Sequence, residues 1–286
     1  MKIIKLLKYT VEFCTISIFF LIFKILGLKK SSYISGKIFN LIGPLFRSKK
    51  TINYNFKTAI PEATPEDIKK YTNNMWNYYG KILAEYVFLK NFRNNTNIQI
   101  NGKEILDKLK KNNENVIFIS GHFDNFELMA MTLDKNEIKV AAIYRPLNNF
   151  FLNKVMVYLR KKYICKNQLK KGRSSVRQMV KMFKDGYSLA LMIDQRVSEG
   201  IKSPFFKKEA LTTTIPAQFI KKFNCKVVPI YIERKSGVNF VVKIFEPIEF
   251  RKEVELKEIT AKLNDWLEKM IIKNPSKWIW SHNRWK

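Results

Sequence analysis

One histidine and the carboxylates that follow it are the residues best suited to catalysis. His122 comes directly after the apolar run at residues 116–120 and a glycine, and Asp124 and Glu127 follow it. On one continuous helix, residues five apart point away from each other. His122 and Glu127 can therefore meet only if His122 precedes a helix whose first turn carries Glu127. A carboxylate on one imidazole nitrogen would leave the other nitrogen free to take a proton.

Helix capping is a second explanation for the same side chains. Asp124 or Asn125 could cap the helix, and Asp124 with Glu127 three residues later fits a capping box. A single histidine beside a glycine turn is also often structural. Because the chain contains only two histidines, His122 and His282, the choice of a histidine base falls almost entirely on His122.

The surrounding pattern predicts that His122 lies at the edge of a sheet. After residue 98, short runs rich in β-branched residues alternate with helical patterns. These runs occupy residues 116–120, 140–144, 189–194, 226–233 and 240–245. The alternation predicts an α/β fold, with a mostly parallel central sheet flanked by helices and an antiparallel last strand after Ser236-Gly237.

Several charged residues follow the ends of the expected strands. Arg145 comes after one strand, and Asp194 ends another and is followed by Arg196. Ligands of open α/β sheets bind beyond the carboxyl ends of the strands, so we expect these side chains near His122. An arginine there could bind a phosphate through two hydrogen bonds, and Asp194 could position the acceptor or pair with Arg145.

The N-terminus contains a mostly apolar stretch at residues 9–28, which predicts a membrane anchor. No small-residue cleavage site follows it, which argues against a signal peptide. A buried core helix is one alternative, and Glu12 leaves a tilted interfacial helix as another. Basic residues are denser after the stretch, which predicts a single span with the body in the cytoplasm. We expect an anchor at 1–30, a helical membrane-proximal segment at 31–95 and an α/β domain at 96–286.

Composition restricts the class of protein. A hydrophobic content of 46% excludes a disordered chain, and three scattered cysteines argue against a disulfide framework or zinc site. Two histidines are too few for a His-rich metal site, and no glycine-rich phosphate loop occurs. The net charge of +29 implies an anionic partner, which could be nucleic acid, a membrane surface, a phosphorylated lipid or an acidic carrier protein.

The segment from Gly121 to Glu127 resembles the His-x4-Asp/Glu signature of the glycerolipid acyltransferase superfamily. It is most similar to the branch of lipid A biosynthesis lauroyl/myristoyl acyltransferases, and other segments follow in that family's order. These segments are Tyr144-Arg145-Pro146-Leu147-Asn148-Asn149, Gly172-Arg173, Asp194-Gln195, Pro204-Phe205-Phe206, Thr212-Thr213-Thr214 and His282-Asn283-Arg284. Asp124 departs from the pattern, since many members carry a small residue at that position.

The resemblance implies transfer of a fatty acyl group from acyl carrier protein to a hydroxyl of a lipid A precursor at the bacterial inner membrane. His122 would be the general base and Glu127 would orient its ring, while backbone N–H groups after His122 would stabilise the oxyanion. The expected substrate-binding residues are Arg145, Asp194, Arg196 and Asn125. Neither a metal nor a cofactor is expected, and nucleic acid is not an expected partner.

Two other functions remain open at this point. The chain could acylate another glycolipid or a lysophospholipid, which acceptor specificity would decide. It could instead be a basic membrane-tethered protein that binds nucleic acid or anionic lipid without catalysis, in which case His122 would be dispensable.

Overall fold

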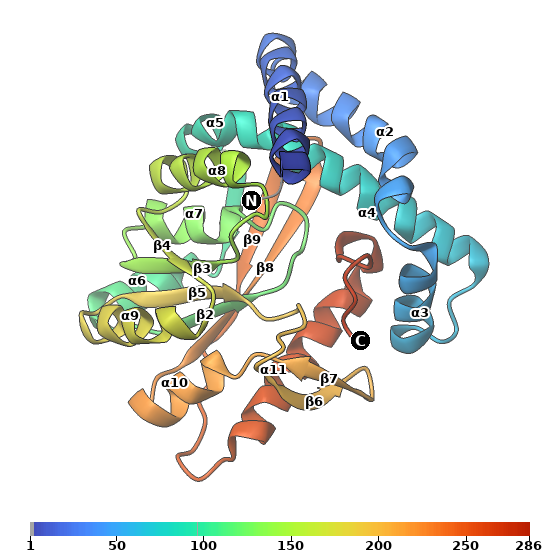
Figure 1. The fold of residues 1–286 in the computed structure, drawn as a ribbon. Helices are drawn as coiled ribbons and strands as arrows, with labels where there is room; N and C mark the ends of the chain where they lie inside the picture. The colour runs from blue at the N-terminus through green and yellow to red at the C-terminus, as the bar shows by residue number, and fades with distance from the viewer. Residues whose placement is uncertain (1–2, 96) are drawn as a thin grey trace.

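The computed structural model describes residues 3–95 and 97–286 (Figure 1). Its main sheet contains β1 (Ile98–Asn101), β2 (Ile117–Ser120), β3 (Val140–Tyr144), β4 (Asn167–Lys170), β5 (Ser188–Met192), β8 (Val227–Ser236) and β9 (Asn239–Ile244). The strand order is β1-β9-β8-β2-β5-β3-β4, and every neighbouring pair is parallel except β8 and β9. This confirms the predicted α/β class and the antiparallel last strand.

Helices cover both faces of this sheet because its strands are buried on both sides. One face packs on α6 (Lys103–Lys111), α7 (Leu128–Lys135), the short η1 (Tyr86–Phe88) and α5 (Leu89–Asn94). The other packs on α9 (Arg173–Lys184), α10 (Ile215–Phe223) and α11 (Leu256–Lys273). Within β2, Phe118 joins the first cluster while Ile117 and Ile119 join the second, as the alternation of strand side chains requires.

Three features of the strands were not predicted from the sequence, and the first is the edge strand β1. The edge strand β4 is polar, and it pairs with β3 beside α8 (Phe150–Tyr163). A separate hairpin of β6 (Ile201–Phe205) and β7 (Lys208–Thr212) packs against α11. Pro204 lies within β6, and a strand proline is tolerated because this two-stranded hairpin has free edges.

The segment before the sheet is helical, with α2 (Leu28–Phe46), α3 (Lys49–Ala59) and α4 (Pro65–Glu85). Glycines allow α2 and α4 to pack closely, since a Cβ at Gly43 would lie 2.4 Å from Trp76. Thr64 and Asp67 form a complete capping box at the start of α4. Phe56 and Trp76 belong to the same hydrophobic cluster as the sheet residue Ile119, so this segment shares its core with the α/β part of the chain.

The first helix, α1 (Ile3–Leu26), is the described helix that is long and apolar enough to cross a membrane. Residues 1 and 2 of the expected anchor lie outside the described residues. One side of α1 contacts the body: the Asn149 side chain donates to the Tyr9 carbonyl at 2.8 Å, the Phe13 and Phe151 rings pack together, and Phe23 is buried. The opposite side carries exposed apolar side chains, and α1 lies at the edge of the molecule (Figure 1).

Candidate active site

His122 lies in the turn after β2, and Asp194 fixes its position from the segment after β5. Nδ1 of His122 is 2.7 Å from Oδ1 of Asp194, and the His122 backbone N–H donates to Oδ2 at 2.8 Å. The indole N–H of Trp278 donates to the same Oδ2 at 2.9 Å. Because β2 and β5 are parallel neighbours, both residues emerge at the same edge of the sheet.

The charge of Asp194 determines which nitrogen of His122 can take a proton. Burial alone would raise the pKa of Asp194, but the charge of His122 and the hydrogen bonds from His122 and Trp278 outweigh it and lower the pKa to about 2. The carboxylate is therefore ionised at neutral pH and only accepts hydrogen bonds. Nδ1 of the neutral ring must carry the hydrogen, which leaves the Nε2 lone pair free.

Glu127 does not contact His122, so the expected hydrogen bond between them is not formed. Glu127 instead pairs with Arg160 of α8, whose Nε donates to its Oε1 at 3.0 Å, and accepts a hydrogen bond from the hydroxyl of Tyr86. Burial would lower the pKa of Arg160, but the charge of Glu127 outweighs it and raises that pKa. Glu127 and His122 still line the same cavity.

The turn between His122 and Glu127 is irregular because its polar side chains point into the protein. Asp124 has a φ of 42°, accepts the backbone N–H of Arg234 at 2.7 Å and pairs with Lys277 at 3.1 Å. Helix α7 begins only at Leu128, without a side-chain cap, so the capping-box interpretation is wrong. Asp124 also does not compete for His122.

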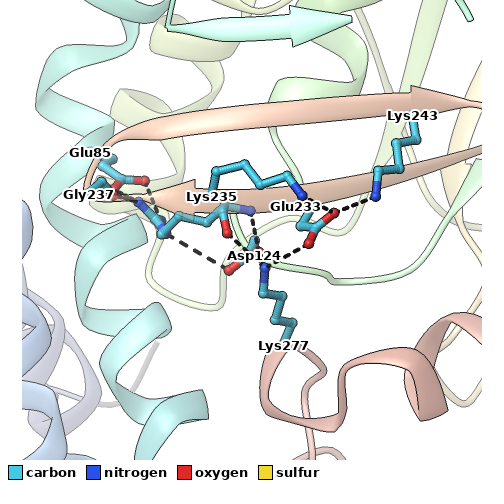
Figure 2. A network of polar contacts seen from close by, with 8 residues as sticks. Glu85, Asp124, Glu233, Lys235, Gly237, Lys243 and Lys277 are labelled. Carbon is cyan, nitrogen blue, oxygen red and sulfur yellow. Dashed lines mark hydrogen bonds and ion pairs between the residues drawn. The ribbon is translucent and has the colours of Figure 1, made fainter. Parts of the chain in front are cut away.

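A buried polar network extends from this turn to three other parts of the chain (Figure 2). Glu85 at the end of α4 pairs with Arg234 of β8 at 2.6 Å and accepts the side-chain amide of Asn125 at 2.9 Å. Lys277 reaches Asp124 from η2 (Pro275–Lys277), and its Nζ also donates to the Arg234 carbonyl at 2.9 Å. The network therefore fixes the turn that carries His122 against α4, β8 and the C-terminal segment.

A cavity of about 400 Å³ opens beside His122 at the carboxyl edge of the sheet. Its apolar lining includes Met129, Ala130, Ala142, Ile143, Ile164, Leu191, Met192, Ile215 and Ile279. Its polar lining includes Tyr79, His122, Glu127, Arg145, Arg160, Lys171 and Gln195. A mostly apolar lining with a few polar and charged groups suits a ligand that is part hydrocarbon and part charged.

The expected substrate-binding residues differ in where they lie. Arg145 lines the cavity and is exposed, without an ion pair to any described carboxylate. Asp194 is 0% exposed and bonds His122, so it cannot contact a substrate or pair with Arg145. Asn125 is 1% exposed and bonds Glu85 away from the cavity. Arg196 does not line the cavity, and its guanidinium Nε donates to the Lys286 carbonyl at 3.1 Å.

Other site residues were not identified from the sequence. Arg160 follows no motif and stands among lysines on α8, so nothing in its spacing distinguished it. His282 was expected to be structural, and its Nε2 accepts the backbone N–H of Arg196 at 2.9 Å. Burial lowers the pKa of His282 to about 4, so it is neutral at pH 7. The side chain of Arg173, in the Gly172-Arg173 segment, lies outside the described part of the chain.

Comparison with known proteins finds relatives with a similar sequence. The family model described as "Bacterial lipid A biosynthesis acyltransferase" matches residues 2–286. A Lipid A biosynthesis acyltransferase from Haemophilus influenzae is 27% identical over 64% of this chain and 60% of its own length. In Escherichia coli, a Lipid A biosynthesis palmitoleoyltransferase is 22% identical (89% and 84% of the two chains) and a lauroyltransferase is 23% identical (84% and 79%).

A solved structure resembles the chain more distantly. The 1-acyl-sn-glycerophosphate acyltransferase from Thermotoga maritima is 15% identical, with a TM-score of 0.41, over 86% of this chain and 98% of that one. The family assignment depends instead on the family model, which extends over nearly the whole sequence. This chain belongs to the bacterial lipid A biosynthesis acyltransferases.

Proposed function

We propose that this protein is a membrane-bound O-acyltransferase that moves a fatty acyl chain from an acyl carrier protein thioester to a hydroxyl of a lipid A precursor. The observation that carries the proposal is the geometry of His122. Its Nδ1 is held by buried, ionised Asp194, and its Nε2 faces the cavity at the edge of the sheet. This is the arrangement that a general base for a hydroxyl requires.

The transfer needs only one proton acceptor and no covalent enzyme intermediate. Nε2 of His122 takes the proton of the acceptor hydroxyl as its oxygen attacks the thioester carbon, and the carbonyl electron pair moves onto the carbonyl oxygen. The tetrahedral intermediate then collapses, the carbon–sulfur bond breaks, and the imidazolium returns its proton to the leaving thiolate. Asp194 stabilises the imidazolium throughout and is not itself protonated.

The cavity supports a substrate with both hydrocarbon and phosphate. Its apolar lining from α7, β3 and β5 can hold an acyl chain, and Arg145 and Lys171 add positive charge to the lining. Burial lowers the pKa of Lys171, and in the described part of the chain neither cation pairs with a carboxylate. Two unpaired cations favour a phosphorylated acceptor over a neutral one.

The charge of the protein suits the proposed donor and the proposed location. A net charge of +29 favours an acidic carrier protein and an anionic membrane surface. The outward side of α1 presents Leu7, Val11, Ile18 and Ile25, each more than half exposed. We infer that this apolar side enters the lipid of the inner membrane, with the cavity facing the cytoplasm where the thioester donor is found.

Mass spectrometry of lipid A tests the proposal directly. Cells that lack the protein should produce lipid A lighter by one acyl chain, and the wild-type chain but not His122→Ala should restore it. Unchanged lipid A with a change in another glycolipid or in phospholipid would favour the alternative acceptors. Restoration by His122→Ala would exclude this histidine as the base.

A further inference from the structure

The oxyanion of the proposed reaction needs hydrogen-bond donors, and most backbone N–H groups that follow His122 are already engaged within the protein. Four N–H groups of this turn already have acceptors within the protein. They are the N–H groups of His122 to Asp194 Oδ2 (2.8 Å), Phe123 to Gly121 O (2.8 Å), Asp124 to Lys277 O (3.3 Å) and Phe126 to Asp124 O (3.1 Å). Among the described groups, only the N–H groups of Asn125 and Glu127 in this turn lack an acceptor, which leaves a role for a side-chain donor beside Nε2 of His122.

Gln195 is placed to be that donor. Its side-chain nitrogen lies 3.4 Å from Nε2 of His122, and the side chain lines the cavity. Consecutive residues thus bracket one ring, with Asp194 on Nδ1 and Gln195 on Nε2. Because Asp194 keeps the hydrogen on Nδ1, Nε2 is an acceptor and the amide of Gln195 donates to it.

We infer that Gln195 is a catalytic residue, whose amide donates to the oxyanion of the tetrahedral intermediate; this inference rests on the proposed function. The acceptor hydroxyl must occupy Nε2, so it displaces the amide from that nitrogen. The hydroxyl oxygen attacks the thioester carbon, and the oxyanion forms on the oxygen that is bonded to this carbon. The oxyanion therefore lies next to the displaced amide of Gln195. Side-chain amides supply such hydrogen bonds in other acyl-transfer sites.

The backbone around Gln195 is held in place before substrate binds. The N–H of Ile193 donates to the Ser120 carbonyl at 2.9 Å, and the N–H of Arg196 donates to Nε2 of His282 at 2.9 Å. Asp194 is fixed by His122 and Trp278 between these two bonds. A donor on a fixed backbone needs little reorganisation in the transition state, which is what makes oxyanion donors effective.

Tyr79 is the rival donor in the same cavity. Its hydroxyl oxygen is buried and has no hydrogen-bond partner among the described groups, and burial raises its pKa, so it stays protonated. Arg160 also lines the cavity, but it is engaged with Glu127 and Tyr86. The experiment must therefore separate the amide of Gln195 from the phenol of Tyr79.

Steady-state kinetics can distinguish the two donors. The assay uses acyl carrier protein thioester and lipid A precursor with purified Gln195→Leu, Gln195→Glu and Tyr79→Phe. Gln195→Leu keeps the volume but removes the donor, so kcat should fall about 10²–10³-fold while KM changes only a few-fold. Gln195→Glu should be at least as impaired, because a carboxylate repels the oxyanion. Tyr79→Phe should fall much less.

A proton NMR control shows whether the base remains intact in each variant. The chain has two histidines, so the low-field Nδ1–H resonance of His122 can be assigned by comparison with His122→Ala. It should persist in Gln195→Leu, because Asp194 still binds Nδ1. A kcat of Gln195→Leu within a few-fold of wild type, a loss confined to KM, or loss of that resonance would overturn the inference. Full activity of His122→Ala would instead overturn the proposed base.

Discussion

Asp194 accepts two hydrogen bonds from His122, one from the ring at 2.7 Å and one from the backbone at 2.8 Å. The partner of the histidine is therefore 72 residues away in sequence and follows the neighbouring parallel strand β5, while Glu127 binds Arg160. Because only Asp194 contacts His122, we expect substitutions of Asp194 and Glu127 to affect activity differently.

Asp194→Asn should lose more activity than Glu127→Gln. The amide can present its nitrogen to Nδ1 and thereby favour the wrong tautomer, so we expect kcat to fall about 10³–10⁴-fold with little change in fold. Glu127→Gln keeps a hydrogen-bond acceptor for Arg160 and Tyr86, and we expect a smaller loss of kcat. Kinetics and melting temperatures of both variants check this. A dead Glu127→Gln beside an active Asp194→Asn would restore the dyad that the sequence suggested.

Stability should fall below pH 6.5 because of His282. Burial lowers its folded-state pKa to about 4, so between pH 6.5 and 4 the unfolded chain binds a proton that the folded chain does not. The free energy of unfolding therefore falls as pH falls through this window. The total loss is about 3 kcal/mol once His282 is protonated in both states. Urea unfolding of wild type at pH 7 and pH 5 measures the loss.

The matched variant for that experiment is His282→Gln. Its side-chain oxygen can accept the Arg196 N–H in place of Nε2, and it does not titrate. The unfolding free energy of wild type relative to that of the variant should fall as pH falls, because only wild type carries the titrating group. A constant difference would show that His282 does not titrate in this window.

Arg145 should act on a phosphate of the acceptor. Arg145→Ala should impair turnover of the phosphorylated acceptor, and Arg145→Lys should rescue it in part, because lysine keeps the charge but loses the two-pronged geometry. An acceptor without phosphates should be used about equally badly by wild type and variant. A coupling energy within about 0.5 kcal/mol of zero in this double-mutant cycle would remove Arg145 from the phosphate site.

The two sides of α1 should respond differently to charge. Ile18→Lys lies on the exposed side, so it should weaken binding to anionic vesicles and leave the melting temperature unchanged. Phe23→Lys places a charge where the side chain is 2% exposed, so it should lower the melting temperature. Vesicle flotation measures the binding to anionic vesicles, and thermal melts measure the melting temperature. Wild-type protein that stays in solution beside anionic vesicles at low salt would contradict the anchor.

Much of the fold could be predicted from the sequence because local patterns dominate it. Strand β3 was predicted with its observed bounds, since it is a short apolar run between turn signals. The edge strand β4 was missed because its polar residues carry no such pattern. The hairpin of β6 and β7 was missed because Pro204 interrupts the strand pattern.

His122 could be identified as the candidate base from local features, namely a strand, a glycine turn and the scarcity of histidines. Its partner could be identified only from the folded structure. Strand pairing brings Asp194 to Nδ1, while the buried pairs of Asp124 and Asn125 bend the turn and delay α7 until Leu128. Spacing along the chain cannot reveal these contacts, because they depend on which strands are neighbours and on where buried charges find their partners.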